Sequence, residues 1–209
     1  MKKEQSENLT EIVFIIDRSG SMYPLIDDTI GGFNSFIESQ KKLKGKAYLT
    51  TVLFGNNITN LHNRVDLQEI TPMTKSQYIA GGQTALLDAI GFTIDEVQKR
   101  IDNSKSNDRP DKVICAIITD GEENSSKVYN REKVEAMIKH QTLCHNWEFI
   151  FLGATMDTVR VAMEIGIVNT VAYTANSIGT KSAYVALDNA VNTVRTLGSI
   201  DESWKSYIN

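Results

Sequence analysis

Short runs of almost entirely apolar residues alternate along the chain with longer segments of helical periodicity. The runs at residues 11–17 (EIVFIID) and 112–120 (KVICAIITD) are continuous rather than alternating, which is typical of strands covered on both faces. Amphipathic segments, such as residues 24–42 and 178–197, lie between or after such runs. This order predicts an α/β fold, a Rossmann-like three-layer sandwich with helices on both faces of a mostly parallel, six-stranded sheet.

One pair of runs departs from this pattern. Residues 46–54 (KAYLTTVLF) alternate in polarity, end at a Gly-Asn-Asn turn signal and are followed directly by a second alternating run at 58–65. We therefore expect an antiparallel hairpin at one edge of the sheet. No repeat or shift in composition marks a second domain, so we expect a flexible N-terminus over residues 1–8, one domain over 9–198 and a C-terminal tail over 199–209.

Composition limits the possible partners. The 209 residues carry a formal net charge of -4, and no block of Lys and Arg offsets it, which disfavours a nucleic-acid partner. The first apolar run is too short for a signal peptide or a membrane span. The two cysteines, Cys115 and Cys144, do not indicate a disulfide framework. These features predict a soluble cytoplasmic protein with no membrane partner.

The two buried strands end in the same way, with an aspartate and then a polar loop that contains glycine. The first loop supplies Asp17, Ser19 and Ser21, and the second supplies Asp120. A third polar loop, GGQT at 81–84, contributes Thr84 at a helix start. In an open α/β sheet, ligands bind beyond the carboxyl ends of strands where the strand order reverses, so neighbouring strands would place both aspartates in one crevice.

These side chains offer only oxygen atoms. Two carboxylates and three hydroxyls suit a hard cation such as Mg²⁺ or Mn²⁺, with water completing an octahedron. Two carboxylates brought close together repel one another, and a bound dication would relieve that repulsion. The sequence therefore predicts a metal site made by Asp17, Ser19, Ser21, Thr84 and Asp120.

The three segments also carry a resemblance. DRSGSM at 17–22, GGQTAL at 81–86 and ITDG at 118–121 resemble, in this order, the metal-ion-dependent adhesion site of von Willebrand factor A domains. The resemblance covers roughly residues 9–198 and is closest to the solitary intracellular bacterial members, because the chain shows no signal peptide, disulfide pair or attached domain. It implies a sheet in the order 3-2-1-4-5-6 with one antiparallel edge strand.

The resemblance also implies roles for the predicted ligands. Ser19, Ser21 and Thr84 would contact the metal directly, whereas Asp17 and Asp120 would hold it largely through water. An ion with so few charged ligands would stay electrophilic and seek an acidic side chain of a partner protein. The implied function is metal-dependent protein binding, as an adaptor in an intracellular complex, without catalysis.

Two other function classes fit less well. A Mg²⁺-dependent phosphatase of the haloacid dehalogenase type also places an aspartate after a buried strand, but it needs a general-acid aspartate two positions later, where this chain has Ser19. A nucleotide-binding protein would need a glycine-rich phosphate motif, and neither GxGxxG nor GxxxxGK[ST] occurs.

Several neighbours of the predicted site have open roles. Asp88, one helical turn after Thr84, either orients a ligand hydroxyl or is simply solvated. We expect Glu122, Glu123 and Asn124 to form a solvated loop and Leu25 to be buried. Trp204 in the tail either docks on the domain or stays free, and the sequence does not decide between these.

Overall fold

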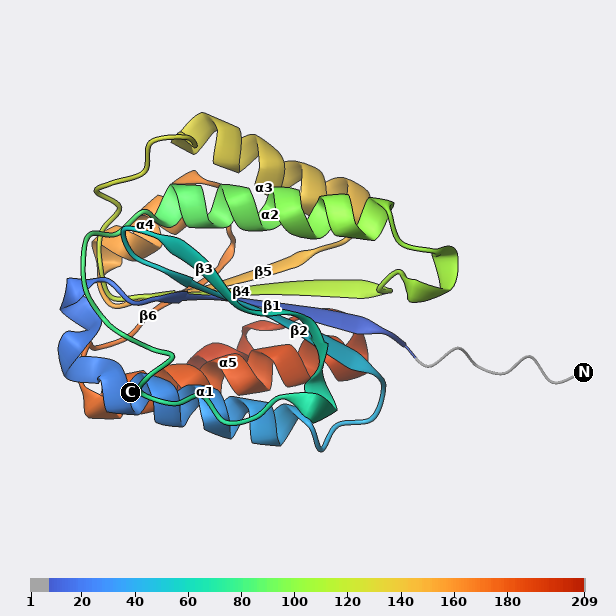
Figure 1. Cartoon of the computed structure of the whole chain (residues 1–209), viewed down its shortest axis with the longest axis horizontal. Coiled ribbons are helices and arrows are strands. Elements are labelled where there is room, and N and C mark those ends of the chain that lie inside the picture. The colour runs from blue at the N-terminus through green and yellow to red at the C-terminus, as the bar shows by residue number, and fades with distance from the viewer. Residues whose placement is uncertain (1–7, 209) are drawn as a thin grey trace, which may run out of the picture.

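The computed structural model describes residues 8–208, and a six-stranded sheet forms its middle layer (Figure 1). The strands are β1 (Thr10–Asp17), β2 (Ala47–Phe54), β3 (Ile58–Asp66), β4 (Lys112–Thr119), β5 (Glu148–Gly153) and β6 (Asn169–Ala172). Their order is β3-β2-β1-β4-β5-β6, and only the β2–β3 pair is antiparallel. The predicted strand order and the predicted edge hairpin are both confirmed.

Helices cover both faces of this sheet (Figure 1). The helices are α1 (Ile26–Gln40), α2 (Leu86–Asp102), α3 (Arg131–His145), α4 (Met156–Glu164) and α5 (Ser177–Leu197). Helices α1 and α5 pack on one face, and α2, α3 and α4 on the other. The predicted three-layer sandwich is thus the observed architecture. No helix within residues 8–208 is both long and apolar enough to cross a membrane.

The continuous apolar run of β1 divides its side chains between two cores. Phe14 and its alternate neighbours join the cluster under α1 and α5, whereas Val13 and Ile15 join the cluster under α2 and α3. All of these side chains are fully buried. Successive side chains of a strand point to opposite faces, so a strand between two helical layers needs apolar residues at every position.

The first helical segment differs from its expected bounds. The sequence pattern predicts a helix from Pro24, but residues Gly20–Leu25 form a 3₁₀ helix (η1) and α1 begins at Ile26. Leu25 is buried, as predicted. The missing N–H of proline is tolerated inside such a short, tight turn. The turn carries the chain from the end of β1 back to α1.

The sequence predicts a flexible segment at the N-terminus and a tail at the C-terminus, and the structure describes these two ends to different extents. The expected flexible N-terminus, residues 1–8, lies outside the described residues except for Asn8. In the expected C-terminal tail, residues Glu202–Tyr207 form a 3₁₀ helix (η4) that packs against α5. Its Trp204 is buried in the core cluster under α1 and α5. The tail therefore completes that core as far as residue 208.

Candidate functional site

The loop after β1 is shaped by the aspartate that ends the strand. Asp17 is fully buried, and its Oδ1 accepts a hydrogen bond of 2.6 Å from the backbone N–H of Ser19. Its Oδ2 accepts a hydrogen bond from the hydroxyl of Thr119, the last residue of β4. Aspartate is well suited to this role because its short carboxylate can bond to the backbone two residues on. Asp17 therefore holds the start of the loop and ties β1 to β4.

Three hydroxyl groups converge on one point beside this aspartate. A Cβ atom added to Gly121 would lie 2.8 Å from Thr84 Oγ1 and 3.4 Å from Oγ of both Ser19 and Ser21. The Oγ atoms of Ser19 and Ser21 are 3.1 Å apart, and the Ser21 hydroxyl donates a 2.6 Å hydrogen bond to Asp120. The structure thus brings together the five side chains singled out from the sequence.

Backbone hydrogen bonds fasten the loop after β1 to the loop that precedes α2. The N–H of Gly20 donates to the carbonyl of Gly82 at 3.0 Å, and the N–H of Gly81 donates to the carbonyl of Arg18 at 2.8 Å. Gly82 has a φ of 85°, a left-handed conformation that suits glycine. These bonds hold the loop that carries Ser19 and Ser21 against the loop that carries Thr84.

Burial changes the acidity of both carboxylates. Desolvation raises the pKa of Asp17, although the hydrogen bonds from Thr119 and Ser19 oppose the increase. Desolvation also raises the pKa of Asp120 to about 6, and the nearby negative charge of Asp17 adds to this effect against the hydrogen bond from Ser21. Two adjacent carboxylates with raised pKa values disfavour their own charged forms. A cation between them would remove this penalty.

Comparison with solved structures identifies the fold. The ArnB paralog VWA2 from Sulfolobus acidocaldarius matches 88% of this chain with a TM-score of 0.56 at 18% identity. A von Willebrand factor type A structure from Catenulispora acidiphila matches 88% with a TM-score of 0.56 at 15% identity. The chain has the von Willebrand factor A fold. Proximal thread matrix protein 1 from the mussel byssus is also similar, over 92% of this chain, with a TM-score of 0.55 at 14% identity.

The similarity is confined to part of each larger protein. This chain spans 45% of the VWA2 chain, 42% of the Catenulispora chain and 46% of the mussel chain. No family model matches the sequence, and no curated protein matches it significantly. At these identities the solved structures establish the von Willebrand factor A fold and leave the function of the site to be argued from its residues.

The chemistry of the site is unlike that of a cluster of strong metal ligands. Within residues 8–208, no group of three or more His, Cys, Asp or Glu side chains could hold a metal ion. The converging set instead combines two carboxylates with three neutral hydroxyls. Such oxygen donors suit hard cations that retain several water ligands, as Mg²⁺ does.

The loop after β4 is more ordered than the sequence suggests. Glu122 and Asn124 are exposed, as expected for a solvated loop, whereas Glu123 is half-buried. Glu123 accepts hydrogen bonds from the N–H groups of Leu87, Ser125 and Ser126, and Asn124 exchanges hydrogen bonds with the N–H and carbonyl of Thr84. These bonds satisfy free N–H groups at the start of α2, which have no partner inside the helix. They also hold Thr84 in place.

Asp88 takes neither of the two roles considered for it. Its carboxylate accepts hydrogen bonds of 2.8–2.9 Å from the backbone N–H groups of Lys127, Val128 and Tyr129. Asp88 is only 7% exposed. It therefore fastens the far end of the loop after β4 onto α2, rather than orienting a site hydroxyl or facing solvent.

We expect Asp88→Ala to destabilise the protein by about 2 kcal/mol, because it removes one charged acceptor from three N–H groups in a partly buried loop. Urea unfolding followed by circular dichroism measures this difference. Glu122→Ala, which removes an exposed carboxylate from the same loop, should change stability by less than about 0.5 kcal/mol. Equal stability of the two variants would contradict a fastening role for Asp88.

Proposed function

We propose that this chain is a protein-interaction module that binds a partner through a divalent cation, Mg²⁺ or Mn²⁺. Asp17, Ser19, Ser21, Thr84 and Asp120 would hold the ion. The observation that carries the proposal is the meeting of three hydroxyl oxygens around the point where a Cβ of Gly121 would lie, beside two carboxylates of raised pKa. The residues present fit a hard dication in both donor type and charge.

The five residues would have two different roles at the ion. Ser19, Ser21 and Thr84 point their hydroxyls to a common centre and are suited to direct contact. Asp17 has both carboxylate oxygens engaged by Ser19 and Thr119, which suits a ligand that orients the loop and acts on the ion through water. When bound, the ion would supply an electrophilic centre able to accept a carboxylate oxygen from a partner.

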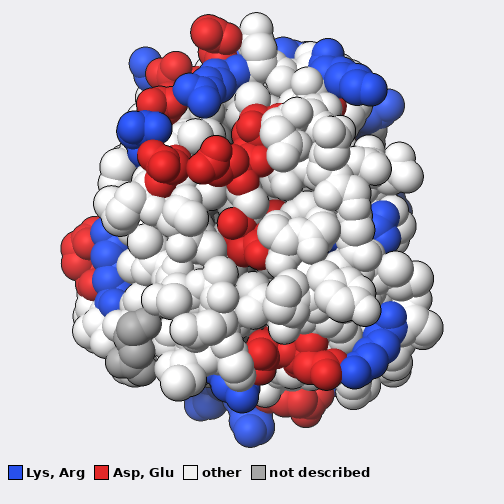
Figure 2. All heavy atoms as spheres, turned by 90° about the vertical axis from the view of Figure 1, so that its left-hand side faces the viewer, with Lys and Arg blue, Asp and Glu red and all other residues white. Residues whose placement is uncertain are grey.

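The surface around the site is negatively charged, so an acidic partner would need the bound ion in order to dock there. Figure 2 views the molecule from the carboxyl ends of the strands, and acidic side chains run down the middle of this face, with Lys and Arg mostly toward its margins. Such a face repels carboxylates at close range. A dication at its centre would reverse the local potential and would also select for an acidic side chain.

A binding role fits the site better than phosphoryl chemistry does. A nucleophilic aspartate needs an accessible oxygen and a nearby general acid. Asp17 is fully buried with both oxygens hydrogen-bonded, and Ser19 occupies the position that a general acid would need. We therefore infer a binding protein and not an enzyme.

The first test is thermal unfolding in EDTA and across a Mg²⁺ and Mn²⁺ series. A ligand at about a hundred times its dissociation constant adds roughly 2.7 kcal/mol to the stability of the native state, a shift of roughly 5–10 °C in a domain of this size. We expect this shift in the wild type. If a partner protein is captured equally well in Mg²⁺ and in EDTA, the proposed metal dependence is overturned.

Gly121→Ala provides a sharp variant for the same test. The added methyl group would fill the point where the three hydroxyls meet, 2.8 Å from Thr84 Oγ1, while leaving both carboxylates in place. We expect it to lose most of the metal-dependent shift, so that less than about 1 kcal/mol remains. Gly31→Ala is the matched control, because its Cβ would meet no atom of residues 8–208 within 4 Å outside its own helix backbone, and it should keep the full shift.

A further inference from the structure

Two large apolar side chains are exposed beside the proposed ion-binding oxygens. These oxygens form the hydroxyl site and belong to Asp17, Ser19, Ser21, Thr84 and Asp120. Tyr23 is 71% exposed on η1, and Ile79 is 66% exposed on the segment that leads into Gly81. Single exposed apolar residues are ordinary on a protein surface, whereas two that line the same hollow mark a surface for binding.

Tyr23 and Ile79 line one hollow with a volume of about 400 Å³. Every lining residue comes from one of two segments, residues 23–27 and residues 75–80. Apart from Asp27 and Lys75, the lining side chains are apolar or aromatic, and they include the buried ring of Tyr78. The hollow is therefore suited to one large apolar side chain.

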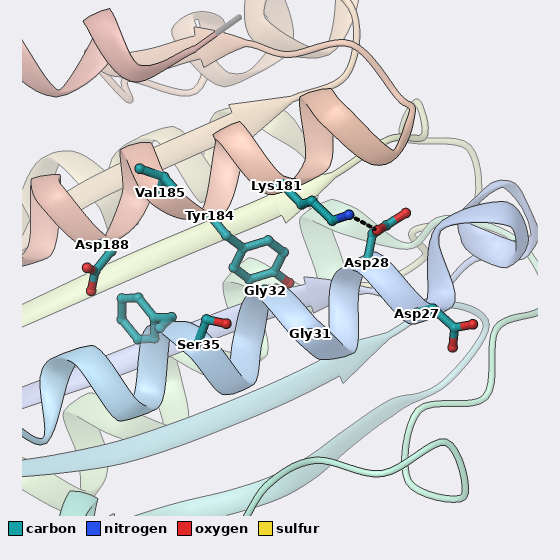
Figure 3. Close-up of a pocket in the computed structure, with 10 residues that line it drawn as sticks. Asp27, Asp28, Gly31, Gly32, Ser35, Lys181, Tyr184, Val185 and Asp188 are labelled. Atoms are coloured by element: carbon teal, nitrogen blue, oxygen red, sulfur yellow. Dashed lines mark ion pairs between the residues drawn. The ribbon is translucent and has the colours of Figure 1, made fainter.

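The two charged groups in this lining neutralise each other. Asp27 points away from α5 (Figure 3), and its carboxylate pairs with Lys75 at 2.5 Å. Asp28, the next residue, faces α5 instead and pairs there with Lys181 at 3.4 Å (Figure 3). The hollow therefore has no net charge of its own, and it would select its occupant by apolar contact and not by charge.

The hollow and the hydroxyl site are built on the same two segments. Tyr23 follows Ser21 by two residues in a 3₁₀ helix, which rises about 2 Å per residue. On the other segment, Ile79 directly follows Tyr78, whose hydroxyl donates a hydrogen bond to the backbone carbonyl of Asp17. A partner chain with a carboxylate on the ion would therefore have the hollow within reach of its neighbouring residues.

A second hollow, on the α2 side of the site, has a different character. Its lining is largely polar and includes Asn56, Asn57, Asn60 and Lys127. An apolar side chain buried there would leave these amides without water or a partner. The apolar neighbour of a bound acidic residue therefore belongs on the side of Tyr23 and Ile79.

We propose that the partner segment bound at the hydroxyl site carries a large apolar side chain within one or two residues of its acidic one. The apolar side chain packs between Tyr23 and Ile79 while the carboxylate contacts the ion. An extended chain advances about 3.3 Å per residue, so such a neighbour spans the short distance to the hollow. This inference rests on the proposed metal-dependent function and adds a second anchor to it, one that supplies affinity through burial.

Fluorescence anisotropy in Mg²⁺ and in EDTA tests the proposal with three short labelled peptides. Each has a Gly/Ser background and a different centre: Leu-Asp-Leu, Ser-Asp-Ser or Leu-Asn-Leu. In Mg²⁺, we expect the Leu-Asp-Leu peptide to bind roughly tenfold more tightly than the Ser-Asp-Ser peptide, because only leucine is buried in the hollow. The Leu-Asn-Leu peptide should not bind, since it offers the ion no carboxylate. No peptide should bind in EDTA.

Two variants assign the apolar contact to this hollow. Ile79→Ser should weaken the Leu-Asp-Leu peptide roughly fivefold and leave the Ser-Asp-Ser peptide unchanged, because the double-mutant cycle isolates the contact between the two altered groups. Tyr23→Ser should act in the same way. Leu143→Ser is the matched control, since it removes a side chain that is 73% exposed on α3, and it should leave both peptides unchanged. All three variants should keep the Mg²⁺-dependent shift in melting temperature.

The failure of this inference and the failure of the metal-dependent function give different results. Equal, metal-dependent binding of the Leu-Asp-Leu and Ser-Asp-Ser peptides would overturn the apolar anchor alone. Equal binding of the Leu-Asp-Leu peptide in Mg²⁺ and in EDTA, still weakened by Ile79→Ser, would overturn the metal dependence and keep the apolar contact. A wild-type dimer in sedimentation velocity that Ile79→Ser dissociates would mean that a second copy of the chain covers the hollow.

Discussion

Asp120→Asn is expected to make the metal-free protein more stable and the magnesium-loaded protein less stable than the wild type at pH 7.5. Without metal, the variant removes one of two partly desolvated carboxylates that disfavour each other's charge. With metal, it removes a charge that the ion needs. We expect a gain of about 1 kcal/mol in EDTA and a loss of most of the roughly 2.7 kcal/mol that saturating Mg²⁺ adds.

The pH dependence of stability in the metal-free protein tests independently whether the charge of Asp120 destabilises the folded state. The pKa of Asp120 rises from its usual 3.8 to about 6 in the folded state, so the folded protein binds a proton more tightly than the unfolded chain does. The resulting stabilisation is full below about pH 4 and is lost as the pH rises through about 6. In EDTA, the wild type should therefore lose about 1 kcal/mol between pH 4 and pH 7 relative to Asp120→Asn, a value reduced for solvent screening.

Thermal and urea unfolding at several pH values, in EDTA and in Mg²⁺, measure both effects. Glu122→Gln is the matched control, since it removes an exposed carboxylate from the next position but one in the same loop. It should shift stability little in either buffer. An Asp120→Asn variant that is less stable than the wild type in EDTA would mean that Asp120 is not held against its own charge.

The fold could be predicted largely because its strands carry a simple signal. The runs that became β1 and β4 are apolar at every position, and only a strand between two helical layers has a use for both sets of side chains. The edge strand β3 carries the opposite signal, because none of its residues is buried. Polarity alone does not place every strand, because β2 alternates in sequence and is nevertheless buried at almost every position.

Convergence of the site residues could be predicted for a related reason. Parallel neighbours end at the same edge of a sheet, so Asp17 and Asp120 had to meet once β1 and β4 were adjacent. The roles of Glu123 and Asp88 could not be predicted in this way. Both depend on how the loop after β4 folds back over the start of α2, and a carboxylate that accepts N–H groups there has the same local sequence as a solvated one.

The buried position of Trp204 had no local signal either. The chain reverses direction after α5 at Gly198, which has a left-handed φ of 87°, and only then does η4 reach the core. A tryptophan in a short polar segment is compatible with a free tail or with a docked one. Trp204 is buried in the core cluster because η4 packs against α5, a contact that exists only in the assembled fold.

Glu11→Ala is expected to cause a large loss of stability, about 3–5 kcal/mol, at the end of the sheet opposite the hydroxyl site. Glu11 lies near the start of β1 and is fully buried. Its carboxylate pairs with the guanidinium groups of Arg100, on α2, and Arg64, on β3, at 3.7 Å for the latter, and it accepts a 3.2 Å hydrogen bond from Thr50. Alanine would leave two largely buried guanidinium groups without their common counter-charge.

Urea unfolding of Glu11→Ala should therefore show a much lower midpoint, whereas Asp157→Ala, which breaks the exposed pair with Arg160, should change stability by about 0.5 kcal/mol or less. Because Glu11 and the hydroxyl site lie at opposite ends of β1, folded Glu11→Ala should retain the Mg²⁺-dependent shift in melting temperature. A Glu11→Ala variant as stable as the wild type would show that water solvates the two guanidinium groups well enough without Glu11. A stable fold that has lost its response to Mg²⁺ would instead mean that the two ends of β1 are coupled.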